Sequence, residues 1–176
     1  DDIVGYDKKI DLRKDKRINP NIIISYNYRY YITKDIIDYM NSNIINLHIS
    51  LLPWNRGAYP NIWSFLKNTP KGVSIHQVNE VIDGGDILVQ KEVFIDEVKE
   101  TLNSSYILLH TEIQKLFKDN WNYIKNRELD PIPQSHEGSL QTIIDFEKVK
   151  PLIYNWNMPI VELKKSYKEM VGTRDV

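Results

Sequence analysis

Short apolar runs alternate with a helical pattern in the first part of this chain. Residues 21–26 and 44–48 are β-branched apolar runs with little polar alternation, which is typical of strands covered on both faces. Between them, Ile36 and Ile37 begin an apolar helical face, and Thr33 can cap that helix at its start. A strand, a helix and a strand joined by short links form a βαβ unit, which predicts an α/β fold with a parallel sheet.

The pattern continues after a loop at residues 51–60, which is punctuated by prolines and a glycine. Pro60 suits the first turn of a helix, which we expect to end near residue 66. Residues 73–78 alternate and residues 87–95 form a further apolar run, so two more strands are predicted. The sequence Asp83-Gly84-Gly85-Asp86 predicts a tight turn between them.

A long amphipathic helix is predicted from Thr101, because apolar residues recur at steps of three and four as far as Ile124. Prolines from Pro131 onward prevent its continuation. In the more polar remainder, residues 140–146 are predicted to form a strand and residues 161–170 a short helix.

Composition narrows the classes of function. The chain has 176 residues with 23 basic and 24 acidic side chains, a formal net charge of −1, so no basic surplus indicates a nucleic-acid partner. It has no cysteine, which excludes disulfides, thiolate metal ligands and cysteine nucleophiles. No run approaches the roughly 20 apolar residues needed to cross a bilayer, so no membrane partner is predicted.

Polar side chains gather at the end of the second predicted strand. Because side chains alternate along a strand, Asn46, His48 and Ser50 share one face, while Leu47 and Ile49 share the other. In open α/β sheets, ligands bind at the carboxyl ends of strands. Taken alone, Asn46 and His48 are better explained as buried polar groups that have hydrogen-bond partners.

A second polar group lies downstream. His76 precedes Asp83 by seven residues, and Gly84 and Gly85 are expected to let the turn adopt positive φ and approach a ligand closely. The simpler interpretation is that Asp83 only shapes the turn and that His76 is structural. Asp86, on the other side of the glycine pair, is the rival carboxylate.

Several fixed spacings occur together in one stretch of the chain. They are Asn46-Leu47-His48-Ile49-Ser50-Leu51-Leu52-Pro53, Arg56-Gly57, Pro60, Gly72-Val73-Ser74-Ile75-His76 and Ile82-Asp83-Gly84-Gly85-Asp86-Ile87. This set resembles the folate-dependent formyltransferase family, whose signature is Asn-x-His-x-Ser-Leu-Leu-Pro, then Gly-x-x-x-His and an aspartate in a tight turn. The resemblance is densest over residues 21–93 and weaker through the long helix.

Within that family, three segments are most similar to the nucleotide-linked sugar N-formyltransferases. They are Ser25-Tyr26-Asn27-Tyr28-Arg29-Tyr30, Pro60-Asn61-Ile62-Trp63-Ser64 and Ile132-Pro133-Gln134. The resemblance implies the formyltransferase fold, a Rossmann-like, mostly parallel sheet flanked by helices. We expect the catalytic domain over residues 1–130, with opening strands missing upstream of Asp1, and a small C-terminal appendage over residues 131–176.

The resemblance also implies the chemistry. Asn46, His48 and Asp83 match the catalytic trio, and the formyl donor is 10-formyltetrahydrofolate. The acceptor amine attacks the formyl carbon, and the resulting oxyanion accepts hydrogen bonds from Asn46 and from a protonated His48. His48 can also relay a proton, while Asp83 favours the imidazolium and fixes its orientation.

The binding residues follow from the same resemblance. The folate pterin is expected against the strand end and the turn before Asp83, with the binding residues Ser25, Tyr26, Asn27, Tyr28, Val81 and Ile82. Val81 and Ile82 are interpreted either as apolar walls of this site or simply as core residues. The nucleotide sugar is expected to contact Ser50, Trp54, Arg56 and Tyr59. Arg56 faces a diphosphate in one interpretation and fixes its own loop in the other. His76 and Asp86 are expected to support the site from behind.

The predicted function is transfer of a formyl group to the amine of a nucleotide-linked amino-deoxy sugar, with a dTDP-sugar favoured. The resemblance implies a cytoplasmic homodimer that serves the biosynthesis of bacterial surface polysaccharides such as the O-antigen of lipopolysaccharide, with no metal. A methionyl-tRNA formyltransferase, or an enzyme using another acceptor, is the alternative within the family. From a different class, a metal-dependent hydrolase would use His48, His76 and Asp83 as ligands.

Overall fold

The computed structural model describes residues 3–11, 19–135 and 137–172. Its first elements are strand β1 (Ile23–Tyr26), helix α1 (Lys34–Tyr39) and strand β2 (Ile44–His48), and β1 and β2 are parallel. The predicted βαβ unit is therefore confirmed. Thr33 is the N-cap of α1, although its side chain accepts no backbone hydrogen bond there and donates instead to Asp35.

The middle of the chain also matches the sequence pattern closely. It contains strand β3 (Arg56–Gly57), helix α2 (Pro60–Leu66), strands β4 (Gly72–Gln77) and β5 (Ile87–Glu92), and helix α3 (Leu102–Lys125). Thr101 caps α3 in a reciprocal arrangement in which Thr101 and Ser104 each bond the other's backbone N–H. The predicted helix at Pro60 and the long helix after Thr101 are both confirmed.

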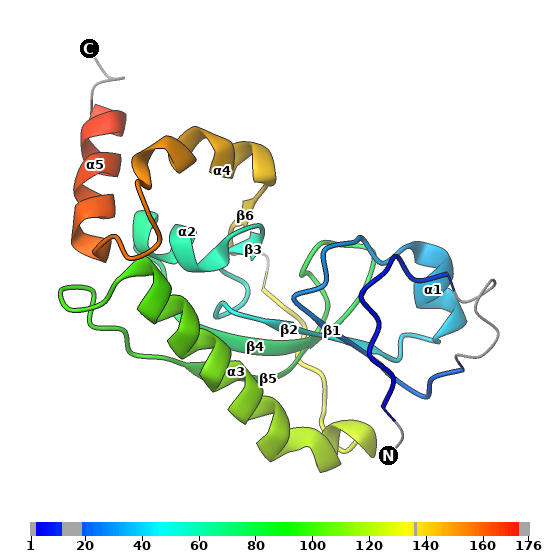
Figure 1. The fold of residues 1–176 in the computed structure, drawn as a ribbon. Helices are drawn as coiled ribbons and strands as arrows, with labels where there is room; N and C mark the ends of the chain where they lie inside the picture. Colours follow the sequence, from blue (N-terminus) through cyan, green and yellow to red (C-terminus); the bar gives the residue numbers. More distant parts are fainter. Residues whose placement is uncertain (1–2, 12–18, 136, 173–176) are drawn as a thin grey trace.

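The main sheet corrects one prediction. Its strand order is β1-β2-β4-β5, and only the β1–β2 pair is parallel, while the β2–β4 and β4–β5 pairs are antiparallel. The expectation of a mostly parallel sheet is wrong: the segment that holds α2 returns the chain antiparallel from β2 to β4, and the turn at Asp83 then reverses it again into β5. The α/β architecture itself is confirmed (Figure 1).

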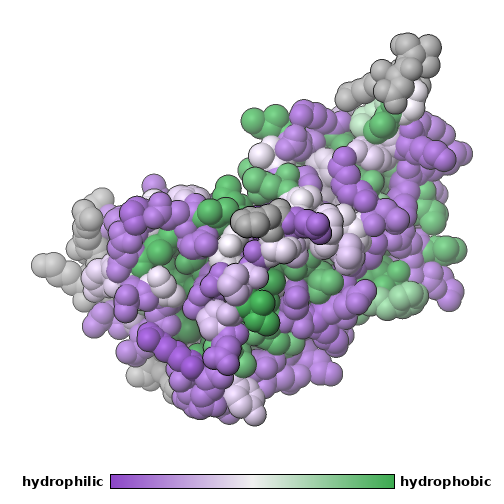
Figure 2. Space-filling model, turned by 180° about the vertical axis from the view of Figure 1, so that it is seen from behind, coloured by the Kyte–Doolittle hydropathy of each residue, from purple (hydrophilic) through white to green (hydrophobic). Residues whose placement is uncertain are grey.

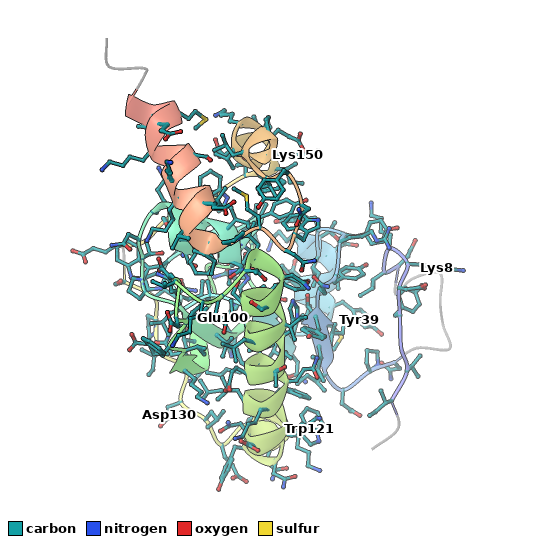
Figure 3. The ribbon with its side chains drawn as sticks, turned by 60° about the vertical axis from the view of Figure 1, so that its left-hand side comes forward. Lys8, Tyr39, Glu100, Trp121, Asp130 and Lys150 are labelled. Atoms are coloured by element: carbon teal, nitrogen blue, oxygen red, sulfur yellow. The ribbon has the colours of Figure 1, made fainter. Side chains whose placement is uncertain are left out.

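The main core lies between this sheet and the long helix. Ile45 and Leu47 of β2 and Ile75 of β4 are buried in one cluster with Leu109 and Ile113 of α3. Figure 3 shows α3 lengthwise, with Glu100 near its start and Trp121 near its end, while Tyr39 of α1 lies on the other side of the sheet. This packing leaves the opposite face of β2 for polar side chains.

The C-terminal segment is more helical than the pattern indicates. Strand β6 (Leu140–Gln141) pairs with β3, and it is followed by helix α4 (Ile143–Val149), the 3₁₀ turn η1 (Lys150–Leu152) and helix α5 (Ile160–Gly172). The predicted strand over residues 140–146 is wrong beyond Gln141, because Thr142 caps a new helix with Asp145. The predicted helix near residues 161–170 is confirmed.

The C-terminal segment shares the main core. Phe146, Met158, Ile160 and Leu163 belong to the same buried cluster as Ile75 of the sheet. The division of the chain at residue 130 stays a prediction. On the face shown in Figure 2, hydrophilic residues cover most of the surface and apolar ones show in small groups between them. In the part of the chain that the structure describes, no helix could span a membrane.

Candidate functional site

The strand register brings the predicted site residues together. Asn46 of β2 lies opposite Ser25 of β1 on one side and His76 of β4 on the other, and His48 lies opposite Ser74. Leu47 faces the core below α3, so Asn46 and His48 share the other face of the sheet. Predicted residues from three strands, Ser25, Asn46, His48 and His76, thus meet at the end of β2.

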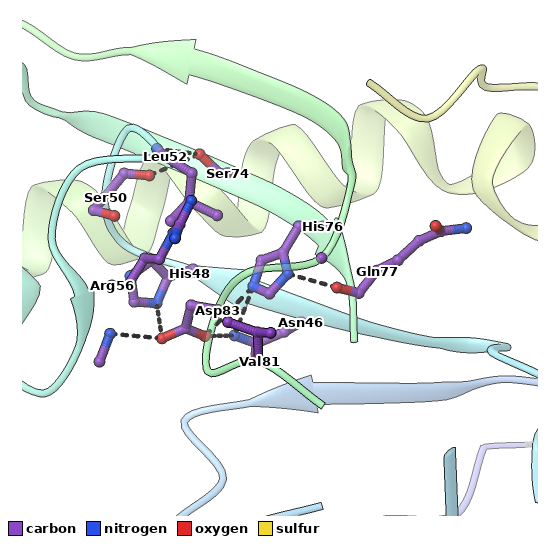
Figure 4. Close-up of polar contacts among 12 residues, drawn as sticks. Asn46, His48, Ser50, Leu52, Arg56, Ser74, His76, Gln77, Val81 and Asp83 are labelled. Atoms are coloured by element: carbon purple, nitrogen blue, oxygen red, sulfur yellow. Dashed lines mark hydrogen bonds and ion pairs between the residues drawn. The ribbon is translucent and has the colours of Figure 1, made fainter. Parts of the chain in front are cut away.

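Asp83 is the centre of this group (Figure 4). Its Oδ1 accepts a hydrogen bond from Asn46 Nδ2 at 3.1 Å and lies 3.5 Å from His76 Nε2. Its Oδ2 accepts from the backbone N–H of Gly57 at 2.8 Å and lies 3.7 Å from His48 Nδ1. The carboxylate therefore faces both imidazoles and is held between the β2 strand and the loop that follows it.

The ring nitrogens can be assigned from their partners. His48 Nε2 lies 3.0 Å from the backbone carbonyl of Asn55, and since a carbonyl only accepts, Nε2 carries the proton. In neutral His48 the other nitrogen, Nδ1, is then unprotonated, and its 3.7 Å separation from Asp83 exceeds a hydrogen bond. Nδ1 is thus the nitrogen that can take up a proton, and the carboxylate of Asp83 lies beside it.

The side-chain NH₂ of Asn46 already has two hydrogen-bond partners. His76 Nδ1 lies 2.7 Å from the carbonyl of Gln77, so Nδ1 donates and a neutral His76 offers Nε2 as an acceptor. Asn46 Nδ2 lies 3.2 Å from that Nε2 as well as donating to Asp83. Both amide hydrogens of Asn46 are engaged, so a ligand oxygen must replace one of these partners before Asn46 can donate to it.

Burial and charge set the protonation states. Burial of His48 holds the pKa of its imidazole below the ordinary value, and His76 lowers it further, although the Asp83 charge and the Asn55 carbonyl oppose this shift. Burial alone would raise the pKa of Asp83, but His48, His76 and the N–H of Gly57 outweigh it and hold that pKa well below the usual range. At neutral pH, the site therefore holds a neutral His48 beside an ionised Asp83.

The turn that carries Asp83 corrects a second expectation. Asp83 itself has the left-handed conformation, with φ 47°, whereas Gly84 and Gly85 do not adopt positive φ. The glycines are needed for space, because a Cβ on Gly85 would lie 1.9 Å from the carbonyl oxygen of Gln77. Asp86 takes part through its backbone carbonyl, which accepts from Gln77 N, so Asp83 rather than Asp86 reaches the site.

The predicted acceptor residues are spread along the loop after β2. Ser50 is buried and donates to the carbonyl of Trp54 at 2.8 Å, so its hydroxyl holds the loop. Trp54 and Arg56 are half-buried, and Arg56 donates from Nε to Gln134 at 2.9 Å. Tyr59 is exposed on one side and stacks on Phe146 with ring centroids 3.5 Å apart.

The predicted folate residues form an open edge. Tyr26 and Asn27 are exposed at the end of β1, beside Ser25 and therefore beside Asn46. Val81 and Ile82 are 58% and 50% exposed, so the interpretation of these two as core residues is wrong. Tyr28 is partly buried, and its hydroxyl accepts from Ile10 N and donates to the carbonyl of Lys8.

The two sides of this edge lie close together. Tyr31 donates to the carbonyl of Glu80 at 3.1 Å, which joins the segment after β1 to the turn before Asp83. Exposed apolar side chains at a strand end suit a flat heteroaromatic ring, which buries its faces against them. The residues present therefore fit a pterin, and they would hold it next to Asn46.

Several residues of the site were missed by sequence reasoning. Asn55 and Gly57 contribute backbone groups to His48 and Asp83, and backbone contacts leave no trace in side-chain chemistry. Gln134 bonds the Asp83 turn from a distant segment, and its only signal was its place in the Ile-Pro-Gln segment noted above. Within the described residues, no group of three or more His, Asp or Glu side chains has the arrangement of metal ligands.

Comparisons with known proteins place the chain in a family. A model of the family described as formyl transferase matches residues 7–119. The formyltransferase PseJ from Anoxybacillus kamchatkensis, solved with UDP-4,6-dideoxy-4-formamido-L-AltNAc and tetrahydrofolate, is 43% identical with a TM-score of 0.84, over 90% of this chain and 84% of PseJ. A sugar N-formyltransferase from Shewanella sp FDAARGOS_354 is 26% identical with a TM-score of 0.70, over 88% of this chain and 65% of the relative.

Methionyl-tRNA formyltransferases are also similar in sequence. The enzyme of Ehrlichia canis (strain Jake) is 37% identical over 134 residues, which are 73% of this chain and 43% of the relative. This chain thus spans less than half the length of that relative, and the similarity covers the shared part alone.

Proposed function

This chain belongs to the formyl transferase family, and from that premise we propose that it moves a formyl group from 10-formyltetrahydrofolate to the amine of a nucleotide-linked amino sugar. The observation that carries the chemistry is the carboxylate of Asp83, which bonds Asn46 and faces His48 at the end of β2. A proton acceptor, an amide donor and a counter-charge are thus within reach of one reacting carbon.

His48 acts first as a base in this proposal. The folate supplies the formyl group, and the acceptor amine loses a proton as it attacks. His48 Nδ1 takes this proton because Nε2 is committed to the Asn55 carbonyl. Asp83 then stabilises the imidazolium at 3.7 Å, and His48 returns the proton to the leaving folate nitrogen.

Asn46 stabilises the oxyanion. As the formyl oxygen gains charge, Asn46 exchanges its 3.2 Å contact with His76 for a hydrogen bond to that oxygen, and keeps the bond to Asp83. His76 in turn keeps Asn46 oriented before the substrate arrives. This step gives the buried and otherwise unexplained His76 a role behind the catalytic residues.

The nucleotide-linked acceptor is supported by the similarity to PseJ, whose complex holds a UDP-linked formamido sugar and which is matched over most of both chains. The match to methionyl-tRNA formyltransferase covers less than half of that enzyme, and the net charge of −1 gives no surplus of positive charge for a tRNA. The preference for a dTDP-sugar stays a prediction. Both dTDP-linked and UDP-linked sugars are therefore candidates for the assay. The role in surface polysaccharides, the homodimer and the cytoplasmic location remain proposals.

The test is a transfer assay on the full-length protein. It uses 10-formyltetrahydrofolate with UDP- and dTDP-linked 3-amino and 4-amino sugars, with methionyl-tRNA as a separate acceptor. Formylation of one sugar nucleotide, detected by mass spectrometry and lost with His48→Ala, supports the proposal. Activity on methionyl-tRNA alone overturns the acceptor but keeps the chemistry. Hydrolysis without formyl transfer, together with stoichiometric bound metal, would favour the hydrolase that uses His48, His76 and Asp83.

A further inference from the structure

One amide side chain connects three segments of the site. Gln134 follows α3 by nine residues and is half-buried. Its Nε2 donates to the backbone carbonyls of Asp83 at 2.8 Å and Gly85 at 2.7 Å. Its Oε1 accepts from Arg56 Nε at 2.9 Å. Gln134 therefore touches the turn that carries the catalytic carboxylate and the loop that faces the predicted acceptor.

The orientation of this amide is fixed by its partners. Both carbonyls can only accept, so the NH₂ group must face them, and Oε1 must then face Arg56. Turning the amide over would place its oxygen against two carbonyl oxygens and its nitrogen against a guanidinium. The three hydrogen bonds thus connect Arg56 to the backbone of the Asp83 turn through one side chain, so the positions of the two segments are coupled.

The backbone conformation of the Asp83 turn depends on such hydrogen bonds. Asp83 adopts φ 47°, which a non-glycine residue holds only when its surroundings favour it. Its carboxylate is kept 3.7 Å from His48 by the N–H of Gly57 and the amide of Asn46. Gln134 holds the backbone that carries this carboxylate, through the carbonyls of Asp83 and Gly85.

The same contact orients the guanidinium of Arg56. Its Nε–H is used by Gln134, which leaves the terminal N–H groups of the guanidinium. Within the described residues, no carboxylate lies at ion-pair distance from Arg56. A half-buried guanidinium without a counter-charge suits an anionic group on a ligand, such as a nucleoside diphosphate.

We propose that Gln134 is a positioning residue that couples Arg56 to Asp83, so that an anionic acceptor bound at Arg56 steadies the catalytic carboxylate. This inference rests on the proposed function for its reaction, and on the three hydrogen bonds for its geometry. It assigns Gln134 a part in catalysis without contact with the reacting atoms.

The test compares Gln134→Met with Glu137→Gln. Methionine keeps the length and bulk of Gln134 but makes none of its three hydrogen bonds, while Glu137 is exposed in the same segment. We expect Gln134→Met to lower kcat by about 10- to 100-fold, as a displaced catalytic group does, with little change in the KM of the folate. Glu137→Gln should leave both unchanged. Equal loss in both variants, or no loss in Gln134→Met, would overturn the proposal.

A double-mutant cycle separates positioning from general destabilisation. If Gln134 acts through Asp83, Gln134→Met added to Asp83→Asn should lower kcat by less than about 2-fold further, because the coupled partner is already gone. Full additivity of the two losses contradicts the proposal. Thermal unfolding of each variant shows whether a loss comes only from instability.

An NMR titration of the histidines gives a readout that needs no turnover. His48 faces the charge of Asp83 and the ring of His76, and the Asp83 charge raises its pKa. Displacing Asp83 should therefore lower the pKa of His48 in Gln134→Met, and not in Glu137→Gln. An unchanged His48 titration overturns the inference even if wild type transfers no formyl group, the outcome that would overturn the proposed function.

Discussion

The end of β2 and the end of β1 lie side by side in one sheet, yet their residues differ in how deeply they are buried. At the end of β2, Asn46, His48 and His76 bond one another, Asp83 or backbone carbonyls, and the two histidines are 7% and 2% exposed. At the end of β1, Tyr26 and Asn27 are exposed, as are Val81 and Ile82 in the turn before Asp83.

The difference indicates that the end of β2 is suited to catalysis and the end of β1 to binding a ligand. A buried polar group without a partner is costly, so the catalytic centre must satisfy its groups before any ligand arrives. This also preorganises them, which is how such groups stabilise developing charge. The β1 edge is exposed, so a ligand can displace water from its surface. Substitutions should therefore be severe at β2 and mild at β1.

The largest effect is expected from His48→Ala. Loss of a general base typically costs about 10²- to 10⁴-fold in rate, and no other described side chain occupies the position of His48 Nδ1 beside Asp83. Measurement of kcat and of both KM values checks this, with circular dichroism to confirm folding. A folded His48→Ala protein that retains near wild-type kcat would remove His48 from the mechanism.

Asn46→Ala should follow, with a loss of kcat of about 10²- to 10³-fold, as for other oxyanion donors. Asn126→Ala is a matched control, since Asn126 lies at the end of α3 and its side-chain amide donates to Glu128. Steady-state kinetics that give kcat and KM for both variants check this prediction. A loss seen mainly as a raised KM would make Asn46 a binding residue instead.

Asp83→Asn should combine a smaller loss with a shifted pH profile. The reaction needs neutral His48, so kcat/KM falls as pH falls through the pKa of His48. Because the Asp83 charge raises that pKa, its removal should move the acidic limb to lower pH. The loss at the pH optimum should be about 10- to 100-fold. An acidic limb that moves to higher pH would contradict this arrangement of charges.

The smallest effect is expected at the β1 edge, with Tyr26→Phe. The hydroxyl of Tyr26 lies 2.6 Å from His110 Nδ1 and accepts from Gln114 Nε2 at 2.9 Å. These bonds shape the edge but do not reach Asp83, so the KM of the folate should rise only about 2- to 10-fold with kcat unchanged. A fall in kcat comparable to that of Asn46→Ala would remove the contrast between the two regions.

Much of the fold followed from local pattern. The helix at Pro60 and the capped helix at Thr101 were predictable because proline geometry and capping act within one turn. The direction of the strands was not, since β4 and β5 read as strands whichever way they pair. The segment after Gln141 was read as a strand from its isoleucines, although Thr142 and Asp145 form a local helix cap.

By itself, the sequence determined which chemistry is present. Alternation along a strand and turn-forming residues are local properties, and they made Asn46, His48 and Asp83 candidates. Their roles as a catalytic trio were implied by the resemblance to the formyltransferase family. Only the tertiary structure decided how they act. The carbonyl of Asn55 selects the free nitrogen of His48, and Gln134 braces the Asp83 turn from 51 residues away. Such contacts depend on where the chain returns to in space, which no short stretch of sequence specifies.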